Sequence, residues 1–164
     1  RTFIPYLRER NFDNLAIAAP DMGGAKRANS YAKSLACPVI ICHKSRERAN
    51  VVADIKAIGE VEGKNIIIVD DMIDTAGTLC KAAEVLKEKG AVSVRALATH
   101  GILSGEAVSR IEKSVLEEVF ITDTIPHPEL ENHPKIKTVS MAGTFARIID
   151  KVYNYEPISP EFVL

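Results

Sequence analysis

The chain alternates between short apolar runs and longer segments in which apolar residues recur at helical spacing. The short runs are rich in β-branched residues and are apolar at consecutive positions, which predicts strands buried on both faces. We expect strands at residues 14–20, 38–43, 65–70, 91–100, 117–123 and 136–140, and helices at residues 24–36, 77–90, 104–114 and 142–154. Residues 44–63 are polar at first and then mixed, and they predict no regular element before a turn.

Strand and helix follow one another along almost the whole chain, which is typical of the α/β class, a parallel sheet with helices on both faces. Ligands of such proteins bind at the carboxyl ends of the strands. The length of 164 residues suits a single domain over residues 1–164. The proline-rich residues 124–134 predict a surface loop in which His127 and His133 are solvated.

Composition excludes several classes of partner. The formal net charge of −1 offers no bulk attraction to nucleic acid or to an anionic membrane. The sequence shows neither an apolar run long enough to cross a bilayer nor a signal peptide at its start.

Cys37, Cys42 and Cys80 form no C-x-x-C pair, so we expect buried free thiols in a reducing, cytoplasmic compartment. The chain begins with Arg1 rather than Met, which indicates a fragment.

The stretch "NIIIVDDMIDTAGT" carries the clearest chemistry. Asp70 and Asp71 come directly after a buried strand, and residues 74–78 then open a helix. Backbone N–H groups at a helix N-terminus bind phosphate, and Gly77 lets the backbone approach an anion closely. Two carboxylates beside a phosphate fit a sugar phosphate, because vicinal hydroxyls donate well to carboxylate oxygens. Ribose 5-phosphate meets both requirements. The structural alternative is that Asp74 caps the helix and the acidic pair lies in a turn.

The segment "VDDMIDTAGT" resembles the phosphoribosyl diphosphate motif of type I phosphoribosyltransferases, and more closely that of the ribose-phosphate diphosphokinase (phosphoribosyl diphosphate synthetase) family. The stretches "PDMGGAKRA", "HKSRERANV", "ATHGILSG" and "TDTIP" are similar to the same family in order and spacing. The resemblance implies a type I phosphoribosyltransferase-like fold. It also implies that this chain is the C-terminal half of a two-domain enzyme whose N-terminal half is absent.

The family transfers the diphosphoryl group of Mg-ATP to the anomeric hydroxyl of ribose 5-phosphate, giving phosphoribosyl diphosphate and AMP for nucleotide biosynthesis. By resemblance, Lys44 and Arg46 are catalytic, on a loop that closes over the phosphates. Asp21 helps to hold Mg²⁺, and Gly23 and Gly24 form a diphosphate loop with it. The residues implied for ribose 5-phosphate are Arg46, Asp70, Asp71, Asp74, Thr75, Ala76, Gly77 and Thr78.

The resemblance further implies that ATP binds mostly through the missing half, that the isolated fragment is inactive, and that the enzyme forms homo-oligomers, which are hexamers in the family. Ser45 stands where the family often has a basic residue, which lowers the charge of the loop. His100 is expected to be a hydrogen-bonded residue at a strand end rather than a catalytic one. Two alternatives stay open: a phosphoribosyltransferase that consumes phosphoribosyl diphosphate, and a non-catalytic regulatory homologue.

Overall fold

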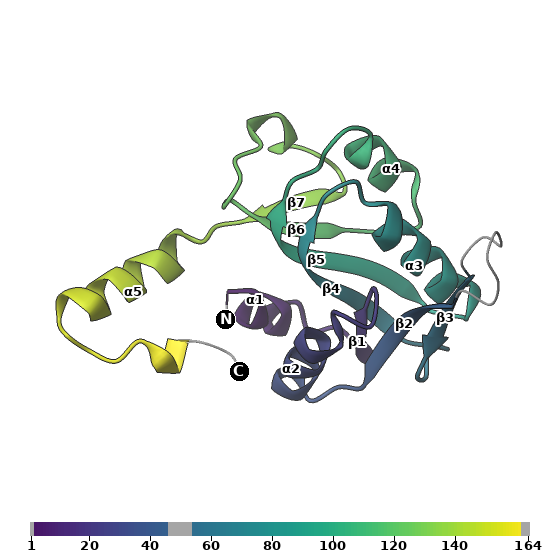
Figure 1. Cartoon of the computed structure of the whole chain (residues 1–164), viewed down its shortest axis with the longest axis horizontal. Coiled ribbons are helices and arrows are strands. Elements are labelled where there is room, and N and C mark those ends of the chain that lie inside the picture. The colour runs from purple at the N-terminus through teal and green to yellow at the C-terminus, as the bar shows by residue number, and fades with distance from the viewer. Residues whose placement is uncertain (1, 46–53, 162–164) are drawn as a thin grey trace.

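The computed structural model describes residues 2–45 and 54–161, and residues 44, 45 and 54 only in their backbone. A single sheet with helices on both sides makes up most of this part of the chain (Figure 1). The elements in chain order are α1 (Phe3–Arg10), β1 (Leu15–Ala19), α2 (Ala25–Leu35), β2 (Val39–Ser45), β3 (Asp54–Ile58), β4 (Asn65–Ile73), α3 (Gly77–Glu88), β5 (Ser93–Gly101), α4 (Ala107–Lys113), β6 (Val119–Thr122), the 3-10 turn η1 (Pro128–Leu130), β7 (Ile136–Val139), α5 (Ala142–Tyr153) and the 3-10 turn η2 (Ser159–Glu161).

The described strands form one seven-stranded sheet in the order β3-β2-β1-β4-β5-β6-β7. Every pairing is parallel except β2 with β3 at one edge. Strand β1 has β2 on one side and β4 on the other, so the strand order reverses between β1 and β4. Such a reversal opens a crevice at the carboxyl ends of the two strands, because the connections leave them toward opposite faces.

The sheet is buried on both faces, as the consecutive apolar positions predict. Ile66 and Ile68 of β4 belong to the core beneath α3 and α4. Ile67 and Val69 belong to a second core beneath α1 and α2. All four side chains are at most 1% exposed. The α/β fold class, with a mostly parallel sheet and helices on both faces, is confirmed.

Two elements of the fold carry no clear local signal. Helix α1 packs Phe3 and Leu7 into the second core, although no helix is predicted there from the sequence. Strand β3 lies within the stretch for which no regular element is predicted, and its pairing with β2 runs antiparallel. A short strand at a sheet edge is held by backbone hydrogen bonds from one neighbour, so it needs little periodic pattern of its own.

Helix α5 lies apart from the sheet, joined to it by an extended segment after β7 (Figure 1). It has no buried residue, and Phe145, Ile149 and Val152 on it are more than half exposed. Thr2 links the N-terminal segment to it through a hydrogen bond with Thr144 at 2.7 Å between the hydroxyl oxygens.

The cysteines are free thiols. Cys42 and Cys80 are buried as predicted, whereas Cys37 is only partly buried. Burial raises the pKa of Cys42 to about 11. The prediction that the two loop histidines are solvated is wrong. The His127 ring contacts the Gly101 carbonyl through Nε2 at 2.6 Å, and the His133 side chain is only 8% exposed beside Glu112. No helix in the described part of the chain is long and apolar enough to cross a membrane.

Candidate active site

The crevice between β1 and β4 brings together most of the residues expected to bind a sugar phosphate. Asp21 follows β1, Asp70 lies in β4, residues 74–76 connect β4 to α3, and Gly77 and Thr78 begin α3. They line one hollow of about 180 Å³. Asp21 is far in the sequence from Asp70 and the loop, and the pairing of β1 with β4 makes them neighbours. The hollow is therefore the best candidate for an active site in the described structure.

Backbone contacts fix the shape of the loop between β4 and α3. The Ile73 carbonyl accepts hydrogen bonds from the N–H groups of Ile102 and Leu103, and the Asp74 carbonyl accepts one from Ser104. The Arg110 guanidinium, on α4, donates to the Thr75 carbonyl. In a trans peptide the carbonyl and the next N–H point in opposite directions. The N–H groups that follow these three carbonyls therefore point away from the supporting contacts.

The first turn of α3 adds further N–H donors to the same hollow. The first helical hydrogen bond runs from the Cys80 N–H to the Ala76 carbonyl at 3.0 Å, and no side chain in the described structure caps the helix. Asp74 therefore does not cap α3, contrary to the structural alternative. Ala76, at the N-cap, has a φ of 59°, in the left-handed region that is uncommon for residues with a Cβ. Uncapped N–H groups and the helix dipole together make this turn suitable for an anion.

Asp70 and Asp71 lie inside β4, which extends to Ile73, rather than after the strand. Arg27, on α2, contacts both carboxylates: its Nη1 lies 2.9 Å from Asp70 Oδ1 and its Nη2 lies 2.9 Å from Asp71 Oδ2. Arg27 belongs to the "GGAKRA" segment, but its partners are more than 40 residues away, so the sequence alone does not indicate this contact.

The two carboxyl groups have different proton affinities. Burial raises the pKa of Asp70, and the positive charge of Arg27 opposes this shift. Partial burial acts in the same direction on Asp71, but the hydrogen bond with Asp70 and the charge of Arg27 outweigh it, so the pKa of Asp71 lies below its ordinary value. The pair thus consists of a readily ionised acid and a neighbour whose ionisation depends on a nearby cation.

The segment after β1 is tightly folded around Asp21. The Gly24 N–H donates to Asp21 Oδ1 at 3.0 Å, and a Cβ on Gly23 would lie 3.2 Å from the same oxygen. Asp21 is exposed and can offer a carboxylate oxygen to a cation. No group of three or more potential ligand side chains occurs among the residues that the structure describes. Mg²⁺ usually takes most of its ligands from water and substrate oxygens, so a single carboxylate such as that of Asp21 suits this ion.

The remaining predicted residues lie outside the small hollow or outside the described residues. Lys44 is in β2, where its backbone pairs with Ile55, and Arg46 lies outside the described residues. Gly23 borders the larger cavity described below rather than the small hollow. His100 is opposite Met72 in the sheet register and shares a hydrogen bond with Thr124 at 2.9 Å, as expected for a residue at a strand end.

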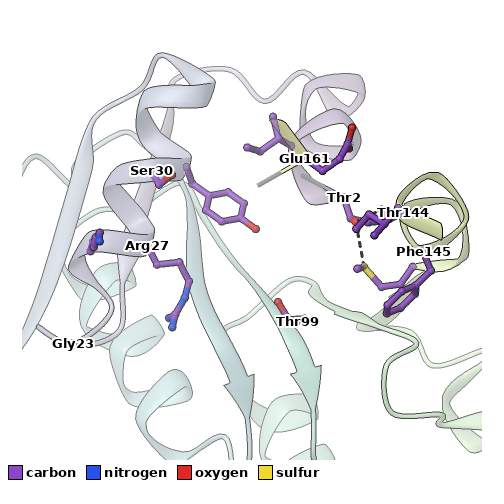
Figure 2. Close-up of a pocket in the computed structure, with 13 residues that line it drawn as sticks. Thr2, Gly23, Arg27, Ser30, Thr99, Thr144, Phe145 and Glu161 are labelled. Atoms are coloured by element: carbon purple, nitrogen blue, oxygen red, sulfur yellow. Dashed lines mark hydrogen bonds between the residues drawn. The ribbon is translucent and has the colours of Figure 1, made fainter. Parts of the chain in front are cut away.

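A larger cavity of about 690 Å³ lies beside the crevice. Figure 2 shows Arg27 and Ser30 on α2 on one side of it, and Thr144 and Phe145 on α5 on the other. Tyr31 also lines this cavity, and burial raises its pKa to about 12. Arg27 thus lies in the wall of the cavity and contacts the acidic pair at the same time.

Comparisons with known proteins indicate the family of this chain. The phosphoribosyl synthetase-associated domain family matches residues 45–163. The ribose-phosphate pyrophosphokinase of Porphyromonas gingivalis is 47% identical over 158 residues, which is 96% of this chain and 50% of that protein. This chain belongs to the ribose-phosphate pyrophosphokinase family. The pyrophosphokinase of Burkholderia pseudomallei is 50% identical over 157 residues, 95% of this chain and 49% of that protein.

Solved structures support the same family. The phosphoribosylpyrophosphate synthetase of Mycobacterium smegmatis superposes with a TM-score of 0.84 at 34% identity, over 93% of this chain and 50% of that chain. An adenine phosphoribosyltransferase shares the fold, with a TM-score of 0.59 at 18% identity over 73% of this chain and 75% of that chain. The chain thus spans about half the length of the family members that it matches.

Proposed function

We propose that this chain is the ribose 5-phosphate-binding half of a ribose-phosphate pyrophosphokinase. The observation that carries the proposal is the small hollow, in which the loop before α3 and the first turn of α3 lie beside Asp70 of β4. A phosphate monoester suits the loop, and vicinal hydroxyls suit the carboxylates. Membership of the family supports this choice of ligand.

In this proposal, the loop at residues 74–78 binds the 5-phosphate and Asp70 and Asp71 accept hydrogen bonds from the ribose hydroxyls. Held at both ends, the sugar cannot turn, and its anomeric hydroxyl takes one position relative to the segment around Asp21. Positioning of this kind is the main contribution of a protein to phosphoryl transfer. Bound Mg²⁺ would neutralise charge on the phosphates of ATP, with Asp21 as a protein ligand.

The chain would act as the C-terminal half of a larger enzyme. ATP would bind mainly to the other half, and Lys44 and Arg46 would bring positive charge to its reacting phosphates. Diphosphoryl transfer to the anomeric hydroxyl would then yield phosphoribosyl diphosphate and AMP. The chain alone would bind ribose 5-phosphate but would not catalyse the reaction. The complete enzyme would be a homo-oligomer, a hexamer as in the family.

Amide NMR of this chain tests the proposal directly. Ribose 5-phosphate is titrated in the presence of Mg²⁺, with inorganic phosphate and free ribose as controls. We expect ribose 5-phosphate to shift the amides of residues 74–78 and of Asp70 and Asp71. Inorganic phosphate should shift only residues 74–78. Unchanged spectra at millimolar ribose 5-phosphate, or shifts confined to another face, would overturn the proposed site.

A further inference from the structure

The contact between Arg27 and the acidic pair has an unusual geometry. Consecutive side chains of a strand point to opposite faces of the sheet. Ile68 and Val69, just before the pair, follow this rule, because they lie in the two separate cores. By the same alternation Asp70 and Asp71 would diverge, yet both contact one guanidinium group at 2.9 Å.

Each carboxylate is also held by the backbone. The Asp71 N–H donates to Asp70 Oδ1 at 2.9 Å, and the Met72 N–H donates to Asp71 Oδ1 at 2.9 Å. Arg27 contributes the second contact of each group, at Asp70 Oδ1 and Asp71 Oδ2. Two carboxylates on adjacent residues repel each other, and a shared cation reduces this repulsion. The planar fork of an arginine also sets the direction of both groups, which the point charge of a lysine cannot do.

We propose that Arg27 is a positioning residue of the sugar site, which holds Asp70 and Asp71 turned to one side as acceptors for the vicinal hydroxyls of ribose 5-phosphate. This inference rests on the proposed function of the hollow. The loop that would take the phosphate is supported separately, by the contacts of residues 102–104 and Arg110. Arg27 should therefore influence recognition of the sugar and not recognition of the phosphate.

Calorimetric titration of this chain with ribose 5-phosphate, and separately with inorganic phosphate, separates these effects. In Arg27→Gln the affinity for ribose 5-phosphate should fall roughly tenfold or more, the scale of one lost charge-assisted hydrogen bond. The affinity for inorganic phosphate should stay unchanged. Arg27→Lys retains the charge without the fork and should recover only part of the loss.

Lys26→Gln is the matched control, because it removes the same charge one position earlier in α2. Lys26 forms no ion pair with any residue that the structure describes, so this variant should bind both ligands as the unmodified chain does. Circular dichroism and a thermal melt of each variant check that the fold is intact.

The possible outcomes separate the positioning role from the proposed function. If the unmodified chain binds ribose 5-phosphate no better than inorganic phosphate, the sugar site itself fails, and the role of Arg27 fails with it. If the unmodified chain prefers ribose 5-phosphate and Arg27→Gln keeps that preference, the sugar site stands and the role of Arg27 is overturned. An equal loss of affinity for both ligands also overturns the role of Arg27, because a general structural defect is then sufficient to explain the loss. Full recovery in Arg27→Lys would show that charge alone matters and would refute the part assigned to the fork.

Discussion

Gly101 ends β5 in close contact with Ile121 of β6, and this contact allows a sharp test of the packing beside the site. A Cβ on Gly101 would lie 2.8 Å from Cδ1, 3.0 Å from Cγ2 and 3.2 Å from Cβ of Ile121. Carbon atoms in a protein core pack at about 3.5–4.0 Å. Ile121 is fully buried, so its packed neighbours limit how far its side chain can shift. The Cδ1 atom can rotate away, but Cβ is held by the strand, so some overlap persists.

Gly101→Ala should therefore lower the free energy of unfolding by about 2 kcal/mol, the middle of the range for overpacked cores. For a chain of this size the melting temperature should fall by roughly 4–8 °C. Urea unfolding followed by circular dichroism measures the change, and the m-value should stay constant if the unfolded state is unaffected.

Ile121→Val provides the internal control, because it removes the Cδ1 atom that the new methyl group would meet first. Alone, this change should cost about 0.5–1.5 kcal/mol. In the Gly101→Ala background it should cost less or stabilise the protein, with a coupling energy of about 1 kcal/mol. Strictly additive effects would refute the steric argument. They would show that the end of β5 relaxes without meeting Ile121.

Three further predictions concern the site and the loop around η1. Asp70→Asn should weaken ribose 5-phosphate binding roughly tenfold or more while leaving ATP binding by the full-length enzyme unchanged, and calorimetry showing equal losses for both ligands would indicate misfolding instead. Lys44→Ala in the full-length enzyme should lower turnover at least about a hundredfold, and near-normal steady-state rates would remove Lys44 from the mechanism. Burial of the His127 ring lowers its pKa, but hydrogen bonds with the Gly101 carbonyl and Glu129 outweigh this, so the pKa is raised. The contribution of His127 to the free energy of unfolding should thus be complete below about pH 6.5, the pKa of histidine in the unfolded chain. It should be lost as the pH rises through the pKa of His127 in the folded state. His127→Gln should accordingly destabilise the protein more in acid than in base, and a pH-independent difference in urea unfolding would contradict this.

Local sequence patterns were sufficient for much of the fold. The consecutive apolar residues of β4 and the other central strands predicted burial on both faces, because only a strand covered on each side can bury every side chain. The alternation with helices then indicated a parallel sheet and directed attention to its carboxyl edge. The segments that local patterns missed, α1 and β3, obtain their stability from packing on the sheet or from pairing with one neighbour.

Some parts of the candidate site likewise follow from local sequence patterns, and others depend on tertiary packing. The residues at 70–78 could be predicted because a strand end, a glycine and a helix start lie within a few positions of one another, and family resemblance added Asp21. The part played by Arg27 could not be predicted, since its contacts cross from α2 to β4 and depend on how the helix lies on the sheet. His127 is a similar case, because its nearly buried ring depends on a carbonyl at the end of a distant strand.

The sequence by itself therefore determined most of the elements, the acidic pair and the loop predicted to suit phosphate, because these follow from neighbouring residues. The tertiary structure alone decided the strand order, the reversal between β1 and β4, and the cation that holds the two carboxylates together. Those features arise from contacts between segments that are distant along the chain, and such contacts exist only once the helices have packed on the sheet.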